Sequence, residues 1–299
     1  MRCLAFRKRL IRLEERRRTS MPSTYAHYRL GQQVINSVPK WKKNIIEKNK
    51  ELFNIGLHGP DILFYYEPLK SNPVNAIGYG MHEHSGREFF EHAAEIIREK
   101  DHDARYLAYA YGFICHFVLD TTCHGYIDDK IAESGVSHAE IEVEFDRSLM
   151  IEDGYDPITH NLTGHIVTSA KNAEVISDFF PGTTPDQVED ALKGMIKYNN
   201  LLIAPSRWKR KFIYALLRVS GNYREMHGLL VNFQANPDCE DSTRILRRLY
   251  DITLERAVKL IGEYDSYLVG EQKLDALYHY TFGGKETKNE ERMYEVQND

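Results

Sequence analysis

Two histidines and an aspartate recur at four-residue intervals in the segment ICHFVLDTTCHGY, as His116, Asp120 and His124. On an α-helix this spacing spreads three side chains over about 80° of arc, so two imidazoles and a carboxylate project from one face. The preceding run, 106–118, is largely apolar and would bury that face. Burial of these groups is costly unless they are paired or bind a cation. The pattern therefore predicts either a metal site or a row of hydrogen-bonded core histidines.

A second pair, His138 and Glu142, lies four residues apart in SHAEIEVEFD, residues 137–146. Apolar and acidic residues alternate in this stretch, which taken alone is typical of a half-buried strand. Ser137 followed by Glu140, however, forms a capping box, and a strand among helical neighbours would have no partner for its backbone. We therefore predict a helix that begins at Ser137 and places His138 and Glu142 on one face. This second pair favours the metal site.

Histidine is concentrated in one part of the chain, since nine of the thirteen fall between residues 27 and 138. A metal site would explain this concentration. Imidazole and carboxylate ligands in tetrahedral or five-coordinate geometry suit zinc, and an open coordination position would admit water.

The elements that must position these residues are helices throughout. Apolar residues recur at three- and four-residue intervals in six segments: 40–53, 86–99, 104–124, 187–203, 208–220 and 242–270. Turn-forming residues predict loops between them at 58–61, 71–75, 154–161, 180–186 and 236–241. We predict an all-α protein, a single multi-helix domain with a zinc cluster between its helices.

The two ends of the chain differ from its middle. Residues 1–20 carry eight Arg and Lys against two Glu and are predicted to be a basic N-terminal extension, with Met21 as an alternative start. The helical domain is predicted over 21–282. The stretch 283–299 is charged and almost free of core residues, so we predict a disordered tail.

Composition excludes several classes of protein. The 299-residue chain has a net charge of -5, which gives no overall attraction to nucleic acid or to an anionic membrane, although local basic patches can still bind them. Four scattered cysteines do not form a disulfide scaffold and are predicted to be reduced thiols. The basic N-terminus lacks an apolar core of signal-peptide length, and no 18-residue apolar run occurs, so we expect a cytoplasmic location.

The run RWKRK at 207–211 opens an amphipathic helix, which is either a solvated helix end or a peripheral contact with membrane phosphates.

Five blocks in order, MPSTYAHYRLG, GLHGPDILFYY, GMHEHSGREFF, GFICHFVLDTTCHGY and SHAEIEVEFDR, together resemble the zinc-dependent phospholipase C family. This family comprises all-helical trinuclear zinc hydrolases whose fold is shared with single-strand nucleases. The similarity covers about 21–150 and extends more loosely to about 280.

The resemblance implies eight zinc ligands: His27, Asp61, His82, His116, Asp120, His124, His138 and Glu142. It implies one site of His116, Asp61 and His82, a second of His124, His138 and Glu142, and a third of His27 and Asp120, with Asp120 bridging two metals. His84 is the alternative to His82 as the ligand from this loop. For His27, the alternative to a ligand is a buried structural histidine. His58 is expected beside the ligands. Secreted relatives complete the third site with an N-terminal tryptophan that this chain lacks, so we predict two zinc ions and leave the third open.

The chemistry implied by the resemblance is hydrolysis of a phosphodiester bond with zinc-activated water. Asp61, whose second oxygen can face that water, is the predicted catalytic residue. The substrate could be a phospholipid headgroup, another phosphodiester or single-stranded nucleic acid, the last disfavoured by the acidic chain. Two alternatives stay open: an HD-type phosphohydrolase that uses His102 and Asp103, and a helical protein that binds zinc for stability without catalysis. The sequence does not determine the oligomeric state.

Overall fold

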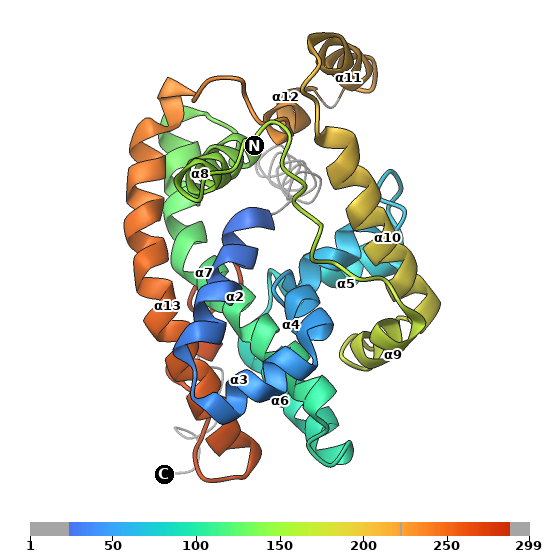
Figure 1. The fold of residues 1–299 in the computed structure, drawn as a ribbon, viewed down its shortest axis with the longest axis vertical. Helices are drawn as coiled ribbons and strands as arrows, with labels where there is room; N and C mark the ends of the chain where they lie inside the picture. The colour runs from blue at the N-terminus through green and yellow to red at the C-terminus, as the bar shows by residue number, and fades with distance from the viewer. Residues whose placement is uncertain (1–23, 222, 288–299) are drawn as a thin grey trace, which may run out of the picture. The chain divides into compact units, whose positions relative to one another are not determined.

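A computed structural model describes residues 24–221 and 223–287 of the protein, and most of these residues lie in helices (Figure 1). Within them the only extended pairing is two isolated bridges, which confirms the all-α prediction. The elements in chain order are α2 (Thr24–Ser37), α3 (Lys40–Lys48), α4 (Lys50–Gly56), η1 (Gly59–Tyr65), α5 (Pro73–Met81), α6 (Gly86–Glu99), α7 (Ala104–Ser134), α8 (His138–Glu152), α9 (Ala170–Asp178), α10 (Pro185–Leu202), α11 (Arg207–Val219), α12 (Tyr223–Met226), η2 (His227–Leu229), η3 (Pro237–Cys239), α13 (Glu240–Leu268) and η4 (Ala276–His279).

The predicted helix over 40–53 is in fact two helices, because the chain leaves the helical conformation at Asn49. The side-chain amide of Asn49 donates to the carbonyl of Ile45 at 2.9 Å, a local bond that competes with the helical ladder. The predicted loop at 58–61 becomes the 3₁₀ helix η1, with Pro60 in its first turn. Apolar periodicity predicts neither feature.

The described residues form two compact units, each assembled from separate stretches of chain. Unit 1 contains the start of α2 up to Ala26, then 126–164 and 196–247. Unit 2 contains 27–125, 165–195 and the chain from Arg248 onward. The chain thus passes repeatedly between the units, and the single domain over 21–282 stays a prediction.

In unit 2, α4 and α7 approach closely enough for their backbones to touch. A Cβ atom on Gly56 would overlap the carbonyl oxygen of Tyr109, and one on Gly112 would overlap that of Phe53. Only glycine fits at either position. Around this crossing, stacked and edge-to-face rings fill the core, among them Phe89 stacked on Phe113 with centroids 3.8 Å apart. The contact fixes α7 against the chain that leads into η1.

In unit 1, α8 begins at the predicted capping box. The hydroxyl of Ser137 accepts from the amide of Glu140, and the Glu140 carboxylate reaches back to the Ser137 amide. The helical interpretation of this segment is therefore confirmed. Further along α8, the buried carboxylate of Asp146 accepts from the amides of Tyr25 and Ala26 at 2.9 and 2.8 Å, which satisfies the first turn of α2.

The ends of the chain are described only in part. Residues 283–287 fold back on the preceding stretch, where the Thr287 amide donates to the His279 carbonyl at 3.1 Å. The rest of the predicted tail, 288–299, and the predicted extension, 1–20, lie outside the described residues, as does Cys3. The other three cysteines are buried free thiols. None of the described helices has the length and apolar character needed to traverse a lipid bilayer.

Candidate metal centre

Helix α7 places His116, Asp120 and His124 on one face, as the spacing predicts. His116 Nε2 lies 3.2 Å from Asp120 Oδ2, and His124 Nδ1 lies 3.8 Å from the same oxygen. His116 and Asp120 are buried. The carboxylate therefore sits between two imidazoles, one turn before it and one turn after it.

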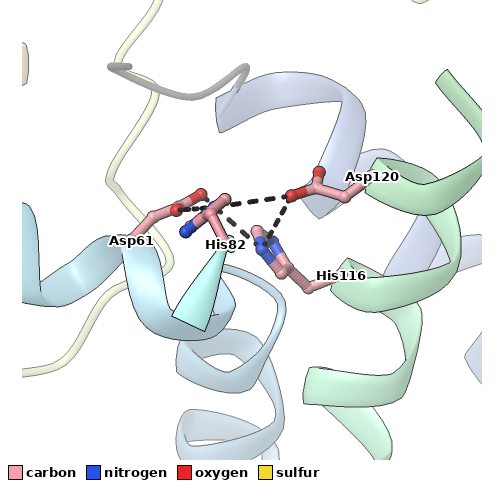
Figure 2. A group of neighbouring side chains, drawn as sticks. All are labelled: Asp61, His82, His116 and Asp120. Carbon is pink, nitrogen blue, oxygen red and sulfur yellow. Dashed lines mark ion pairs between the residues drawn. The ribbon is translucent and has the colours of Figure 1, made fainter. Parts of the chain in front are cut away.

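Asp61 and His82 meet this face from two other segments of unit 2. Asp61 lies in the first turn of η1, and His82 ends α5. His82 Nε2 is 3.1 Å from Asp61 Oδ1 and 3.8 Å from Asp120 Oδ2, while Asp61 Oδ2 is 3.7 Å from His116 Nε2. Figure 2 shows Asp61, His82, His116 and Asp120 converging from these three elements.

The His82 ring is oriented by its other nitrogen. Nδ1 lies 2.9 Å from the carbonyl of Gly78, one turn earlier on α5, and donates its proton to that oxygen. In the neutral ring this leaves the Nε2 lone pair facing the carboxylates, which is the arrangement common in metal-binding histidines. His84, its rival in the sequence, has a side chain that is 64% exposed and lies 3.4 Å from Glu88. The structure brings His82, and not His84, to the group.

Gly59 permits the close approach of η1 to α7. Its φ is +49°, in the left-handed region, and a Cβ atom there would lie 2.6 Å from both Cγ and Nε2 of His116. No larger residue leaves room for the His116 ring. A glycine that precedes Asp61 by two residues thus positions a histidine on another helix.

His27, on α2, approaches Asp120 from the other side. Its Nε2 lies 3.2 Å from Asp120 Oδ1, and its ring stacks on that of His116 with centroids 4.5 Å apart. The predicted pairing of His27 with Asp120 is thus present as a contact. Both oxygens of Asp120 face imidazole nitrogens, as a bridging carboxylate requires.

The other predicted ligands are divided between the units. His138 and Glu142 lie on α8 in unit 1, with Nε2 of the histidine 3.1 Å from Oε1 of the glutamate. His124 lies on α7 in unit 2, where its Nδ1 is 3.0 Å from the carbonyl of Phe282. The i, i+4 pairing on α8 is as predicted. The second metal site, which draws on both units, stays a prediction.

The electrostatics of the group are those of carboxylates and imidazoles in a buried setting. Burial by itself raises the pKa of Asp120, but the charges of His116 and His124 and the close polar contacts of His116 and His27 outweigh it and hold that pKa well below its usual range. For His82, burial lowers the pKa, and the close contact and charge of Asp61 with the charge of Asp120 raise it above its ordinary value. The site therefore favours an ionised Asp120 and positive charge on His82.

Several buried atoms of the group are left without a hydrogen bond. Among the described residues, Asp61 Oδ1, Asp120 Oδ2 and both ring nitrogens of His116 make none. Buried polar atoms of this kind are destabilising unless something satisfies them. Asp61, His82, His116 and Asp120 can each offer one ligand atom, and these atoms lie within 4.8 Å of one another. A zinc ion, which takes imidazole nitrogen and carboxylate oxygen together, fits this set.

His165 contacts His58, the histidine expected beside the ligands, and the sequence-based prediction does not include it. Its Nε2 lies 2.7 Å from Nε2 of His58, and its ring stacks on Tyr28 at 4.1 Å. Burial, followed by the charges of His165, His27 and His116, lowers the pKa of His58 well below its ordinary value. His58 therefore stays neutral beside the group. The segment around His165 has no helical spacing to the predicted ligands, so only the tertiary fold reveals this contact.

The HD pair does not join a metal group. His102 is exposed and has a φ of +55°, and the Asp103 carboxylate accepts from the guanidinium of Arg105 at 2.7 Å. These are the solvated side chains of a helix start. No set of three candidate ligands among the described residues includes either of them.

The fold and the group define an all-helical protein whose imidazoles and carboxylates are arranged to suit a metal ion. A family model described as zinc dependent phospholipase C matches residues 26–193, more than half of the chain, and the chain therefore belongs to this family. The matched residues include all eight predicted ligands. No curated protein and no solved structure gives a significant match.

Proposed function

We propose that the protein is a zinc-dependent hydrolase of phosphodiester bonds that resembles phospholipase C in its chemistry. The observation that carries the proposal is the convergence of Asp61, His82, His116 and Asp120 on a set of atoms that suits zinc. Buried atoms of Asp61, His116 and Asp120 make no hydrogen bond. Family membership supports a hydrolase of this class.

Asp61, His82, His116 and Asp120, all in unit 2, would hold one zinc ion. Zinc held there would polarise a phosphoryl oxygen and make hydroxide available at neutral pH. The Asp120 carboxylate presents one oxygen to His27 and the other to His116, so it can serve two neighbouring cations.

Asp61 is the proposed catalytic residue. Its carboxylate is buried, with one oxygen beside His82 and the other 3.7 Å from His116, so its position is fixed from both sides. An oxygen of Asp61 can accept the proton of an attacking water molecule. Exclusion of bulk water strengthens each of these interactions.

An apolar cavity next to the group supports a lipid phosphodiester as substrate. The cavity has a volume of about 390 Å³ and reaches Phe282, whose ring centroid lies 5.6 Å from that of His82. Its apolar lining includes Ile77, Met81, Phe89, Phe179, Phe180 and Phe282. A diester with an apolar portion could place its phosphate at the group and that portion in the cavity, whereas the acidic chain disfavours nucleic acid.

The test combines metal content with turnover. We expect the protein, purified without added zinc, to contain about two zinc ions per chain by mass spectrometry and to hydrolyse nitrophenyl-phosphocholine. His82→Ala should lose metal and activity together, because it removes a ligand. His84→Ala is the matched control for metal binding, since it removes an exposed histidine from the same loop, and it should retain its zinc. Asp61→Asn should reduce turnover of the metal-loaded enzyme.

Two results would contradict the proposal. Absence of bound metal, even after zinc is added, would return these histidines to a structural role. Stoichiometric zinc without turnover of any diester, from nitrophenyl-phosphocholine to single-stranded DNA, would identify a protein that binds zinc for stability.

A further inference from the structure

Helix α11, in unit 1, carries an apolar stripe on its solvent-facing side. Trp208 is 80% exposed, Phe212 65%, Leu216 54% and Val219 89%. These residues lie four, four and three positions apart, so on a helix they fall within about 80° of arc. Isolated exposed apolar side chains are ordinary, but four that share one face of a 13-residue helix form a continuous surface.

The opposite face of α11 holds the helix in place. Ile213 is buried against Ala204 and Leu230, with Tyr214 and Leu217 packed around this cluster. The buried Arg210 donates to the carbonyl of Val231 at 2.6 Å. The buried face of α11 alone packs the helix against its neighbours. The exposed stripe contributes nothing to this packing.

Cations flank the stripe. Arg207, Lys211 and Arg218 are exposed and lie together along one edge of it, within about 40° of arc. The Lys211 ammonium lies 5.2 Å from the centre of the Trp208 ring. The sequence of α11 contains no acidic residue, and among the side chains that the structure describes no carboxylate pairs with these cations. The charge is local, since the whole chain has a net charge of -5.

We propose that α11 docks the protein on an anionic lipid surface, with its apolar stripe inserted at the boundary between headgroups and acyl chains. An apolar face bordered by Lys and Arg, with a tryptophan on it, is the composition of helices that lie in a membrane interface. Phosphate and carboxylate headgroups supply the negative charge that no described residue supplies. No residue of this surface belongs to the metal group, and the proposal does not depend on the proposed activity.

Charge also decides between a lipid surface and a second copy of the chain. In a twofold dimer through α11 each helix would meet the same surface of its partner. Such a contact would bring the cations of two copies together, with no acidic residue on either helix to offset them. An anionic bilayer offers the apolar depth and the opposite charge at once.

Vesicle sedimentation of the full chain tests the proposal. We expect binding to vesicles of phosphatidylcholine with about 30% phosphatidylserine and little binding to phosphatidylcholine alone. Phe212→Ser should lower the partition coefficient about tenfold, and Lys211→Gln or Arg218→Gln about fivefold each, since each cation contributes roughly a factor of five near such a surface. Leu69→Ser, which changes a leucine that is 83% exposed outside α11, is the matched control and should bind as the parent does.

Tryptophan fluorescence locates the contact. The chain has two tryptophans, Trp41 and Trp208, so Trp41→Phe leaves Trp208 as the single reporter. Its emission should shift to shorter wavelength on binding, and brominated lipids should quench it. Turnover of a soluble diester should be the same in the parent and in every α11 variant. Failure of the membrane-docking proposal can therefore be told apart from failure of the proposed activity.

Three outcomes would overturn the proposal: no binding to anionic vesicles, equal binding by Phe212→Ser and the parent, or an unshifted Trp208 spectrum. A dimer of the parent in light scattering that becomes a monomer in Phe212→Ser would also overturn it, because it would assign the stripe to a second copy of the chain.

Discussion

Substitution of Gly59 by alanine tests whether the glycine before Asp61 sets the position of His116. Gly59 has a φ of +49°, and an added Cβ atom would meet Cγ and Nε2 of His116 at 2.6 Å. His116 has no free space to enter, because it is fully buried and its ring stacks on His27. Either η1 or the His116 ring must therefore move.

The magnitude follows from two terms. An alanine in the left-handed conformation costs about 1–2 kcal/mol. Overpacking of a full site costs about 1–3 kcal/mol more. The free energy of unfolding should fall by about 2–5 kcal/mol, which corresponds to roughly 4–10 °C in melting temperature at about 2 °C per kcal/mol for a chain of this size. Displacement of His116 Nε2 from Asp61 and Asp120 should also lower the zinc content.

The assay is thermal unfolding of the metal-free protein followed by circular dichroism, together with zinc content by mass spectrometry. Gly262→Ala is the control, because Gly262 lies within α13 with nothing near its added Cβ atom. This variant should gain up to about 1 kcal/mol from helix propensity and keep its zinc. If Gly59→Ala melts and binds zinc as the parent does, the assigned role of Gly59 is wrong.

Three further predictions concern stability and metal uptake. Asp146→Ala removes the acceptor of two amides in the first turn of α2 and should lower the free energy of unfolding in urea by about 2–4 kcal/mol, with Asp146→Asn less harmful. Asp265→Ala should destabilise more than Lys42→Met, because it leaves the buried Lys42 ammonium without its carboxylate; equal losses would contradict this reasoning. The carboxylates raise the pKa of His82, so in metal-free protein its stabilising contribution is full below pH 6.5 and is lost as pH rises through the raised pKa. Zinc must displace that proton, so zinc affinity should instead increase with pH over this window, with proton release visible by calorimetry in two buffers.

Local patterns predicted the helices and the ligand faces on them. The spacing of His116, Asp120 and His124 needed only helical geometry, and α7 reproduces it. The alternating pattern in α8 favoured a strand, and the capping box at Ser137 correctly outweighed it because it reports the helix start directly. The fold class and the i, i+4 pairs were thus accessible from the sequence.

Contacts between distant segments were not accessible in the same way. His82 and His84 are two residues apart in one loop, and only the packing of α5 against η1 and α7 decides which of them faces Asp61. The contact of His58 with His165 joins residues 107 positions apart, with no spacing rule to reveal it. These features depend on tertiary packing, which periodicity does not encode.

The backbone contact of α4 and α7 has a consequence for which substitutions the protein tolerates. Gly56 and Gly112 carry no functional group, yet any larger side chain at either position would force the two helices apart. His116 lies one turn beyond Gly112, and Asp61 lies five residues beyond Gly56, so separation of the helices would separate these candidate ligands. Two chemically inert positions are therefore under as strict a constraint as the histidines and aspartates whose spacing they set.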